Sequence, residues 1–275
     1  MTNPEIGKTV TANGIRTNYI EAGSAANPPL ILIHGSGPGV TAFANWNGVI
    51  PTLADHFHIF APDMVGFGYT DCPADLPDIN MDIWVSHIGA FMDAIGVGSA
   101  RFIGNSFGGA LTLALAARQP HKVEKIVLMG AAGLPFPITD GLAKVWGYQP
   151  SPHAMRELME TFAFNPGLVT DAIVESRFQA SIRPGAQEAF ARLFPEPHQT
   201  RLDALCTPEA ALRALTQPTL ILHGREDMIV PLSISQQYHT LIPDSELHVF
   251  GHCGHWTQIE KKERFLELVV PFLKR

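Results

Sequence analysis

The chain has 275 residues, of which 46% are hydrophobic and 16% charged, and these values are typical of a globular protein that can bury a large core. The net charge of −7 and the scattered lysines and arginines argue against a nucleic-acid partner, and no apolar run is long enough to predict a membrane span or a signal peptide. The three cysteines, Cys72, Cys206 and Cys253, are odd in number and far apart, which argues against a disulfide framework and leads us to expect a cytoplasmic protein.

Strand and helix patterns alternate along the first half of the chain. Residues 8–20 alternate loosely around Asn13-Gly14, which favours a hairpin of two antiparallel strands at a sheet edge. Apolar runs at 29–33, 58–61, 101–103 and 123–129 are typical of buried strands. Helices are predicted at 45–53, where Pro51 is a candidate break, at 82–95 and at 110–117. Such alternation predicts a mostly parallel sheet with helices on both faces.

The pattern changes between Pro135 and about Thr216, where short helical patterns recur and no strand-like run is found. Strands resume at 219–222 and 246–250, and a closing helix is predicted at 260–273. We therefore predict an α/β fold with an eight-stranded sheet, a core of residues 1–134 and 217–275, and a helical cap of residues 135–216 inserted after the sixth strand. Ligands bind at the carboxyl ends of strands in such sheets, which favours a substrate lid over a purely stabilising insertion.

The most informative local pattern is Gly104-Asn-Ser-Phe-Gly108, which lies between a strand and a helix. This is the setting of a nucleophile elbow, in which small neighbours allow Ser106 to occupy a sharp turn. The N–H of Phe107 would open the helix and could hold an oxyanion. The glycine-rich loop 34–39 follows an earlier strand and would supply the second donor. A turn that contains serine by chance has the same pattern, so the assignment depends on finding an acid and a base.

An acid and a base follow in the required order. Asp227 comes after one late strand and His255 after the last, and Ser…Asp…His is the chain order of α/β-hydrolases. His255 would take the serine proton, and Asp227 would hold the imidazole in the right tautomer. Glu226 and His252 are the neighbouring alternatives.

A metal site among the histidines and the cysteine of 248–255 is disfavoured because no matching ligand cluster appears elsewhere, so no metal is predicted.

Several longer motifs resemble one family, the meta-cleavage product hydrolases, which break carbon–carbon bonds in ring-fission products of aromatic compounds. Within the family, the chain is most similar to the branch that acts on products of phenols and monoalkyl benzenes. The resemblance covers nearly the whole chain and rests on these stretches: His34-Gly-Ser-Gly-Pro-Gly-Val, Ala44-Asn-Trp, Ala61-Pro-Asp-Met-Val-Gly-Phe-Gly, Gly104-Asn-Ser-Phe-Gly-Gly, Leu128-Met-Gly-Ala-Ala-Gly, Val145-Trp-Gly-Tyr, His223-Gly-Arg-Glu-Asp and Gly251-His-Cys-Gly-His-Trp-Thr-Gln-Ile-Glu.

The resemblance implies an α/β-hydrolase fold, no metal or organic cofactor, and hydrolysis of a vinylogous 1,5-diketone to 2-hydroxypenta-2,4-dienoate and a small carboxylic acid. Arg177 stands out without the family, because it shares a helical face with apolar neighbours and needs a partner; the alternative is an arginine that reaches solvent. The implied roles are a triad of Ser106, Asp227 and His255, an oxyanion hole of Ser36 and Phe107, and a site for the 2-hydroxy or oxo carboxylate end at Asn45, Asn105, Arg177 and Trp256.

Two other functions remain as alternatives. A serine carboxylesterase on the same scaffold would share the triad, although Asn105, Arg177 and Trp256 argue against it. A non-catalytic ligand receptor is disfavoured by the intact triad and oxyanion loop. The expected partner is a small-molecule substrate, with neither nucleic acid nor membrane, and we expect a homodimer or a higher homo-oligomer. The sequence leaves open whether Ser106 forms an acyl-enzyme or assists attack by water.

Overall fold

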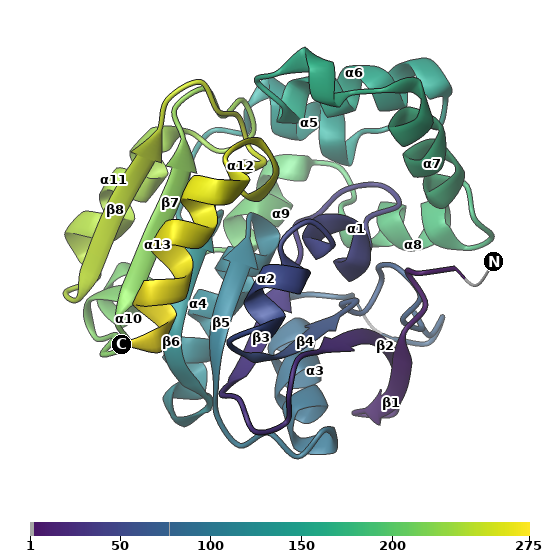
Figure 1. Cartoon of the computed structure of the whole chain (residues 1–275). Helices are drawn as coiled ribbons and strands as arrows, with labels where there is room; N and C mark the ends of the chain where they lie inside the picture. Colours follow the sequence, from purple (N-terminus) through teal and green to yellow (C-terminus); the bar gives the residue numbers. More distant parts are fainter. Residues whose placement is uncertain (1–2, 77) are drawn as a thin grey trace.

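An eight-stranded sheet lies at the centre of the computed structural model, which describes residues 3–76 and 78–275 (Figure 1). Residues 1, 2 and 77, which belong to the predicted core segment 1–134, lie outside the described residues. The strand order is β1-β2-β4-β3-β5-β6-β7-β8, with antiparallel pairs at β1–β2 and β2–β4 and parallel pairs elsewhere. The mostly parallel α/β fold is therefore confirmed. The strands are β1 (Lys8–Ala12), β2 (Ile15–Ala22), β3 (Pro29–Ile33), β4 (His58–Pro62), β5 (Ala100–Asn105), β6 (Val123–Met129), β7 (Thr219–Gly224) and β8 (Ser245–Phe250).

The edge hairpin forms where the sequence predicted it. Asn13 and Gly14 connect β1 to β2 with φ values of 52° and 78°, the left-handed region that a tight hairpin turn requires and that these two residues tolerate. β1 is an outer strand of the sheet and pairs on one side with β2. This hairpin places the N-terminal segment beside the carboxyl end of β4.

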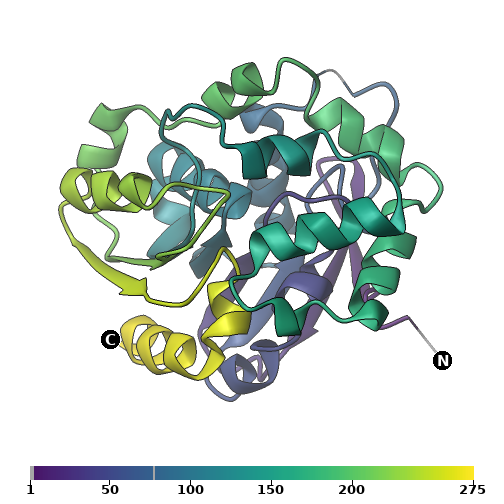
Figure 2. The same ribbon diagram turned by 90° about the horizontal axis from the view of Figure 1, so that it is seen from above.

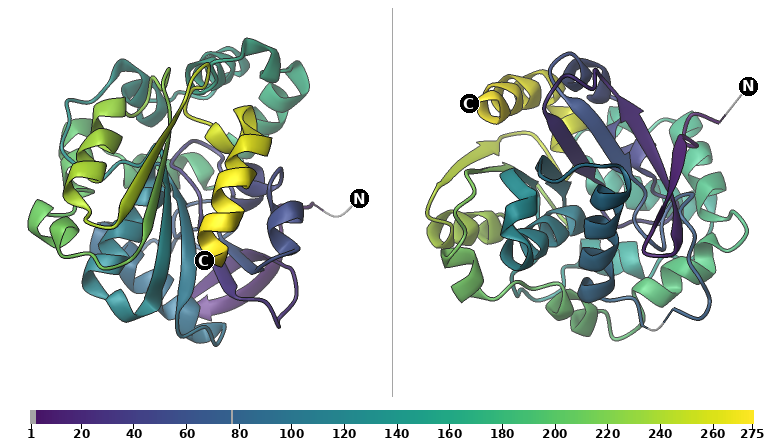
Figure 3. Two further views of the ribbon diagram at one scale, coloured as in Figure 1. Left: turned by 60° about the vertical axis from the view of Figure 1, so that its left-hand side comes forward. Right: turned by 90° about the horizontal axis from the view of Figure 1, so that it is seen from below.

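Alternate residues along each central strand supply two separate cores. In β3, Leu30 and Leu32 belong to the core on one face, whereas Ile31 and Ile33 belong to the other. This alternation explains why the run is apolar throughout. Figure 3 shows α13 on one side of the strands and α3 and α4 on the other. The covering helices are α1 (Ala42–Trp46), α2 (Ile50–Ala54) and α13 (Lys262–Lys274) with the first core, and α3 (Met81–Ala94), α4 (Phe107–Arg118) and α11 (Leu232–Leu241) with the second. The short helix α12 (Thr257–Glu260) directly precedes α13.

One predicted helix is divided in the structure. The pattern at 45–53 suggested a single helix with a break at Pro51, but α1 ends at Trp46 and α2 begins at Ile50. Pro51 lies in the first turn of α2, where its missing N–H has no intrahelical partner to lose. The proline therefore opens the second helix instead of interrupting the first.

Most of the chain between β6 and β7 forms a helical cap over the carboxyl ends of the strands, whereas its last helix lies beside α4 and α11 (Figures 1 and 2). Ser151 and Thr170 cap two of its helices, since their side chains accept from the N–H groups of Ala154 and Ile173. Three helices of this segment, α5, α9 and α10, were not predicted individually because they are too short to give a clear helical pattern. The cap helices are α5 (Asp140–Trp146), α6 (Pro152–Phe162), α7 (Asp171–Ser181), α8 (Ala186–Leu193) and α9 (His198–Ala204), and the last helix before β7 is α10 (Glu209–Arg213). Among the described residues, no helix has the length and apolar character of a membrane span.

Buried histidines make the stability of the fold sensitive to acid. His87 is fully buried on α3, with Nε2 2.8 Å from the Thr17 hydroxyl and Nδ1 without a partner. Burial lowers the pKa of His87 from 6.5 to about 4. The unfolded chain therefore binds more protons between these pH values, so stability is complete above pH 6.5 and falls as the pH drops toward 4.

We expect His87→Gln to weaken this pH dependence. Between pH 7.5 and pH 5, the free energy of unfolding of the variant should fall by about 2 kcal/mol less than that of the wild type. Urea denaturation at the two pH values measures the difference, with the exposed His153→Gln as the control. If the free energy of unfolding has the same pH dependence in the wild type and in His87→Gln, His87 is not the group that makes stability sensitive to acid.

Candidate active site

Ser106 lies at the turn between β5 and α4. Its backbone has φ 54° and ψ −114°, a conformation that is strained for any residue with a side chain, and its N–H donates to the Met129 carbonyl at 2.9 Å. A Cβ at Gly104 would lie 2.5 Å from the Gly108 carbonyl oxygen, and a Cβ at Gly108 would lie 2.3 Å from the Ile33 oxygen. Both glycines therefore permit the close approach of strand and helix that the sequence predicted.

The predicted oxyanion donors come from two different elements. Phe107 is the first residue of α4, where backbone N–H groups have no intrahelical acceptor. Ser36 lies in the loop after β3, and its hydroxyl accepts a hydrogen bond from the Trp146 indole at 3.1 Å. Trp146 of the cap thus fixes the side chain of Ser36, and the backbone N–H of Ser36 would be the second donor of the oxyanion hole.

His34 is buried at the start of the loop that carries Ser36 and helps to fix its backbone. Its Nε2 accepts from the Met64 N–H at 3.0 Å, so Nδ1 carries the proton and donates to the Gly35 carbonyl at 2.8 Å. Burial lowers the pKa of His34 to about 4, which keeps the ring neutral. The loop that carries Ser36 is therefore anchored on both sides.

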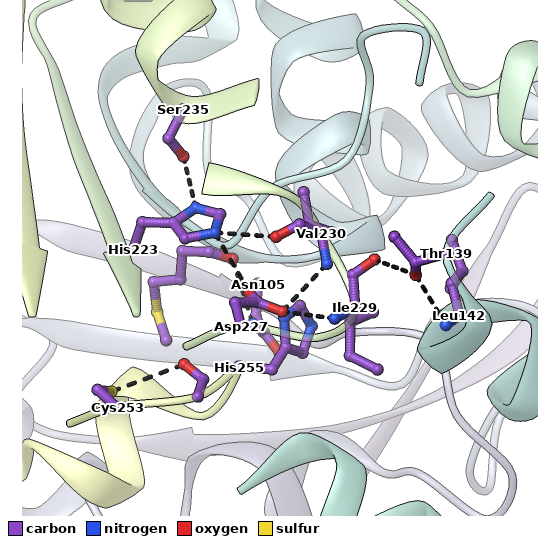
Figure 4. A network of polar contacts seen from close by, with 12 residues as sticks. Asn105, Thr139, Leu142, His223, Asp227, Ile229, Val230, Ser235, Cys253 and His255 are labelled. Carbon is purple, nitrogen blue, oxygen red and sulfur yellow. Dashed lines mark hydrogen bonds and ion pairs between the residues drawn. The ribbon is translucent and has the colours of Figure 1, made fainter. Parts of the chain in front are cut away.

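Asp227 and His255 lie together at the carboxyl ends of the strands (Figure 4). Asp227 Oδ2 is 2.7 Å from His255 Nδ1, and Oδ1 accepts from the N–H groups of Ile229 and Val230 at 2.7 and 3.0 Å. The two side chains are 1% and 2% exposed. Burial would raise the pKa of Asp227, but His255 and the backbone donors outweigh it and hold this pKa below its usual value. The carboxylate is therefore ionised and fixes the orientation of the imidazole.

The two neighbouring alternatives have other partners. Glu226 accepts from the Cys253 N–H at 3.0 Å and from Arg225 at 2.8 Å. His252 is exposed, has φ 53°, and packs against Phe164 with ring centroids 5.5 Å apart. Neither side chain joins the pair formed by Asp227 and His255.

Two residues that the sequence analysis missed shape the space around this pair. Gly130 follows β6 with φ 48°, and a Cβ there would lie 2.9 Å from Asp227 Oδ2 and 3.0 Å from His255 Nδ1. Phe162, at the end of α6, accepts from the His255 N–H at 2.8 Å, and its ring lies over His255 and Trp256. The cap therefore contacts the imidazole directly, and Trp256 is stacked at 5.0 Å against the same phenylalanine.

The two predicted amide side chains lie beside the oxyanion loop. Asn45 Nδ2 is buried and has no hydrogen-bond partner, while its Oδ1 is 3.4 Å from the Gly35 N–H. Asn105 is buried beside Ser106, and its Nδ2 donates to the Met129 carbonyl at 3.2 Å. The unpaired donor on Asn45 is available to a ligand oxygen, since a buried N–H group without a partner is costly.

Arg177 reaches the core from helix α7 of the cap. Its guanidinium forms an ion pair with Glu5 and donates to the Gly39 carbonyl at 3.2 Å. The Arg177 and Glu5 side chains are 20% and 11% exposed, so the arginine does not extend into solvent. This contact joins the cap, the N-terminal segment and the end of the oxyanion loop, and Glu5 was not foreseen from the sequence.

The remaining polar groups near the site include a cysteine. Cys253 is buried two residues before His255, and burial together with Glu260 raises the pKa of its thiol to about 12. It therefore supplies no thiolate at neutral pH. Within residues 3–76 and 78–275, no group of three His, Cys, Asp or Glu side chains is placed to hold a metal ion.

A strained serine after a central strand, a buried Asp–His pair and a glycine-rich loop are the parts of a serine hydrolase. The family profile described as alpha/beta hydrolase fold matches residues 28–204 and 203–262 of this chain. Together with the sheet topology, this match defines the class of the protein as an α/β-hydrolase.

Comparison with individual proteins narrows the class. The chain is 54% identical to the 2-hydroxymuconate semialdehyde hydrolase of Pseudomonas sp. strain CF600, an alignment that covers 98% of this chain and 95% of the relative. It is 50% identical to the 2-hydroxy-6-oxo-2,4-heptadienoate hydrolase of Pseudomonas putida strain F1, with 98% and 97% covered. The crystal structure of the meta-cleavage product hydrolase CumD from Pseudomonas fluorescens IP01, a serine-to-alanine mutant complexed with acetates, superposes with a TM-score of 0.97 at 50% identity over 99% of both chains. The chain belongs to the meta-cleavage product hydrolases, as its motifs indicated.

Proposed function

We propose that this enzyme hydrolyses a carbon–carbon bond in a ring meta-fission product of the 2-hydroxy-6-oxo-hexa-2,4-dienoate type, similar to 2-hydroxymuconate semialdehyde. The products are 2-hydroxypenta-2,4-dienoate and a carboxylic acid, which assigns the reaction to the catabolism of aromatic compounds. The observations that carry the proposal are the buried Asp227–His255 pair and the strained turn at Ser106, in a chain of this family. No metal or organic cofactor takes part in the proposed chemistry.

The triad supplies the nucleophile and the proton transfers. His255 accepts a proton from Ser106, or from a water molecule that it activates, and Asp227 stabilises the imidazolium that forms. The N–H groups of Ser36 and Phe107 stabilise the oxyanion that develops on the distal carbonyl. Both routes, through an acyl-enzyme or through direct attack by water, use the same residues and give the same products.

Cleavage requires a leaving group that can accept the electrons of the breaking carbon–carbon bond. The dienol is first converted to its keto tautomer, so that the bond electrons leave as a conjugated dienolate when the tetrahedral intermediate collapses. Water supplies the hydroxyl group of the carboxylic acid, and a proton goes to the dienolate. We assign the 2-hydroxy or oxo carboxylate end of the substrate to Asn45, Asn105, Arg177 and Trp256, and the support for this assignment is the buried unpaired amide of Asn45.

The cap has a proposed role as a substrate lid. We assign residues 135–216 to this lid and residues 1–134 and 217–275 to the hydrolase core. The contacts of Trp146 with Ser36 and of Phe162 with His255 support the assignment, since movement of the lid would alter both sides of the site.

We further propose that the protein is cytoplasmic and forms a homodimer or a higher homo-oligomer. The three free cysteines are in keeping with a reducing compartment. Light scattering after gel filtration measures the size of the assembly.

Arg177→Gln separates this function from that of a carboxylesterase. Because Glu5 already neutralises the guanidinium, a substrate carboxylate must join or displace that pair, so we expect a loss of about 10- to 100-fold in kcat/KM on ring-fission products. Hydrolysis of p-nitrophenyl acetate should change by less than about twofold, since this ester has no carboxylate to hold.

The control is Arg156→Gln, which removes a cap arginine that pairs with Asp171 on the surface. It should leave both activities unchanged. An equal loss of both activities in Arg177→Gln would make Arg177 a structural tether. No loss of either activity would move the carboxylate site to Asn45 and Asn105.

A further inference from the structure

A second buried histidine contacts the acid of the triad. His223 is the penultimate residue of β7, and its side chain is fully buried. Its Nε2 lies 3.4 Å from Asp227 Oδ2 and 3.0 Å from the Val230 carbonyl oxygen, and its Nδ1 lies 2.7 Å from the Ser235 hydroxyl (Figure 4). The mechanism described above gives this histidine no role.

The partners of His223 determine its tautomer. The Val230 carbonyl can only accept a hydrogen bond, so Nε2 must carry the proton. Nδ1 is then an acceptor, and the hydroxyl of Ser235, a buried residue on α11, donates a hydrogen bond to it. The Nε2–H therefore donates to the Val230 oxygen, and Nε2 also lies 3.4 Å from Asp227 Oδ2, the oxygen that accepts from His255.

This arrangement connects both ends of the turn that carries the acid. Val230 donates its N–H to Asp227 Oδ1 at 3.0 Å and accepts from His223 through its carbonyl at 3.0 Å. The two backbone donors thus hold Asp227 Oδ1, and the positive end of the His223 Nε2–H dipole lies close to Oδ2. Removal of His223 would leave the contact on Oδ2 to His255 alone.

The groups around His223 leave it neutral. Asp227 and His255 are the titratable groups that face it from the turn after β7 and the loop after β8, and α11 contributes the neutral Ser235 and the Tyr238 phenol, which donates to the Ala132 carbonyl. Burial, partly offset by Asp227, lowers the pKa of His223. At neutral pH the ring therefore acts as a dipole with a fixed direction, not as a second positive charge.

We propose that His223 is a positioning residue for Asp227: its Nε2–H fixes the Val230 carbonyl and places the positive end of its dipole near Oδ2, where it stabilises the negative charge that otherwise interacts with His255 alone. The inference rests on the proposed triad. Without the donor, the carboxylate would be protonated more easily and would also stabilise the imidazolium of His255 more strongly. Both effects move the acidic limb of the kcat/KM profile to higher pH.

Two substitutions of similar polarity test the direction of the donor. The amide nitrogen of His223→Gln can occupy the position of Nε2, whereas that of His223→Asn corresponds to Nδ1 and faces Ser235. We expect His223→Asn to raise the apparent pKa of the acidic limb by about 0.5 to 1 unit and to lower kcat/KM at pH 6 by about 3- to 10-fold, with KM nearly unchanged. His223→Gln should stay within about threefold of the wild type, with the limb in its original position. Ser235→Ala, which removes the donor to Nδ1, should shift the limb upward by a smaller amount and serves as the second variant if His223→Asn does not fold.

Equal losses in the Asn and Gln variants without movement of the limb would overturn the inference and leave His223 a purely structural residue. Asp227→Asn, measured in parallel, separates the two levels of the account. If Asp227→Asn is inactive while His223→Asn and Ser235→Ala retain the wild-type pH profile, only the role of His223 is wrong. If Asp227→Asn is fully active, the triad assignment fails and this inference fails with it.

Discussion

Ser106→Ala is expected to lower turnover of a ring-fission product by at least ~10³-fold, because the hydroxyl that attacks the carbonyl or aligns the attacking water is absent. The substitution removes one oxygen atom at a turn whose backbone is held by the Met129 carbonyl and by the helix that follows. The variant should therefore keep its fold. Single-turnover measurements with excess enzyme would give the rate of the chemical step without product release.

The matched control for the nucleophile is Ser99→Ala, which removes a hydroxyl that donates to Glu124 at the opposite end of β5 from the elbow. It should retain wild-type turnover, and circular dichroism should be the same for both variants. Turnover of Ser106→Ala within about tenfold of the wild type would reject Ser106 as the nucleophilic centre.

Asp227→Asn is expected to produce the second large loss, about 10³- to 10⁴-fold in kcat. The amide can donate to His255 Nδ1, which favours the tautomer that has its proton on Nε2, the nitrogen that must accept a proton from the nucleophile. The substitution also removes the negative charge that stabilises the imidazolium. KM should change little, because the residues assigned to the substrate carboxylate belong to other segments.

The neighbouring carboxylate provides a stringent control for the acid. Glu226→Gln removes a charge one residue away, on a side chain that bonds Cys253 and Arg225 instead of His255. Its kcat should remain within about threefold of the wild type. A large loss in Glu226→Gln with an active Asp227→Asn would exchange the two assignments.

The features that sequence predicted well are those set by local pattern. The elbow around Ser106 and the hairpin at Asn13-Gly14 depend on residues a few positions apart, so their glycines could be interpreted directly. The sheet followed from apolar runs and from strand–helix alternation. The candidate acid and base followed from their positions after strands, because the carboxyl ends of parallel strands meet at one edge of the sheet.

Contacts between distant segments could not be predicted in the same way. The choice between Asp227 and Glu226 depends on the direction of side chains in the turn after β7, which the sequence does not reveal. The ion pair of Arg177 joins residues 172 positions apart, and sequence offered only a choice between a ligand and solvent as its partner. Gly130 and His223 matter because the fold brings them against the acid and base; both lie in stretches that resemble the family, but the sequence pattern gave neither of them a role.

The most direct test of the account follows the yellow dienolate absorbance of the ring-fission products of catechol, 3-methylcatechol and biphenyl-2,3-diol with the purified wild-type enzyme. We expect the colour of at least the catechol or 3-methylcatechol product to disappear, with equimolar formation of 2-hydroxypenta-2,4-dienoate and a carboxylic acid. An enzyme that hydrolyses p-nitrophenyl acetate but leaves all three ring-fission products unchanged would contradict carbon–carbon bond hydrolysis as its function.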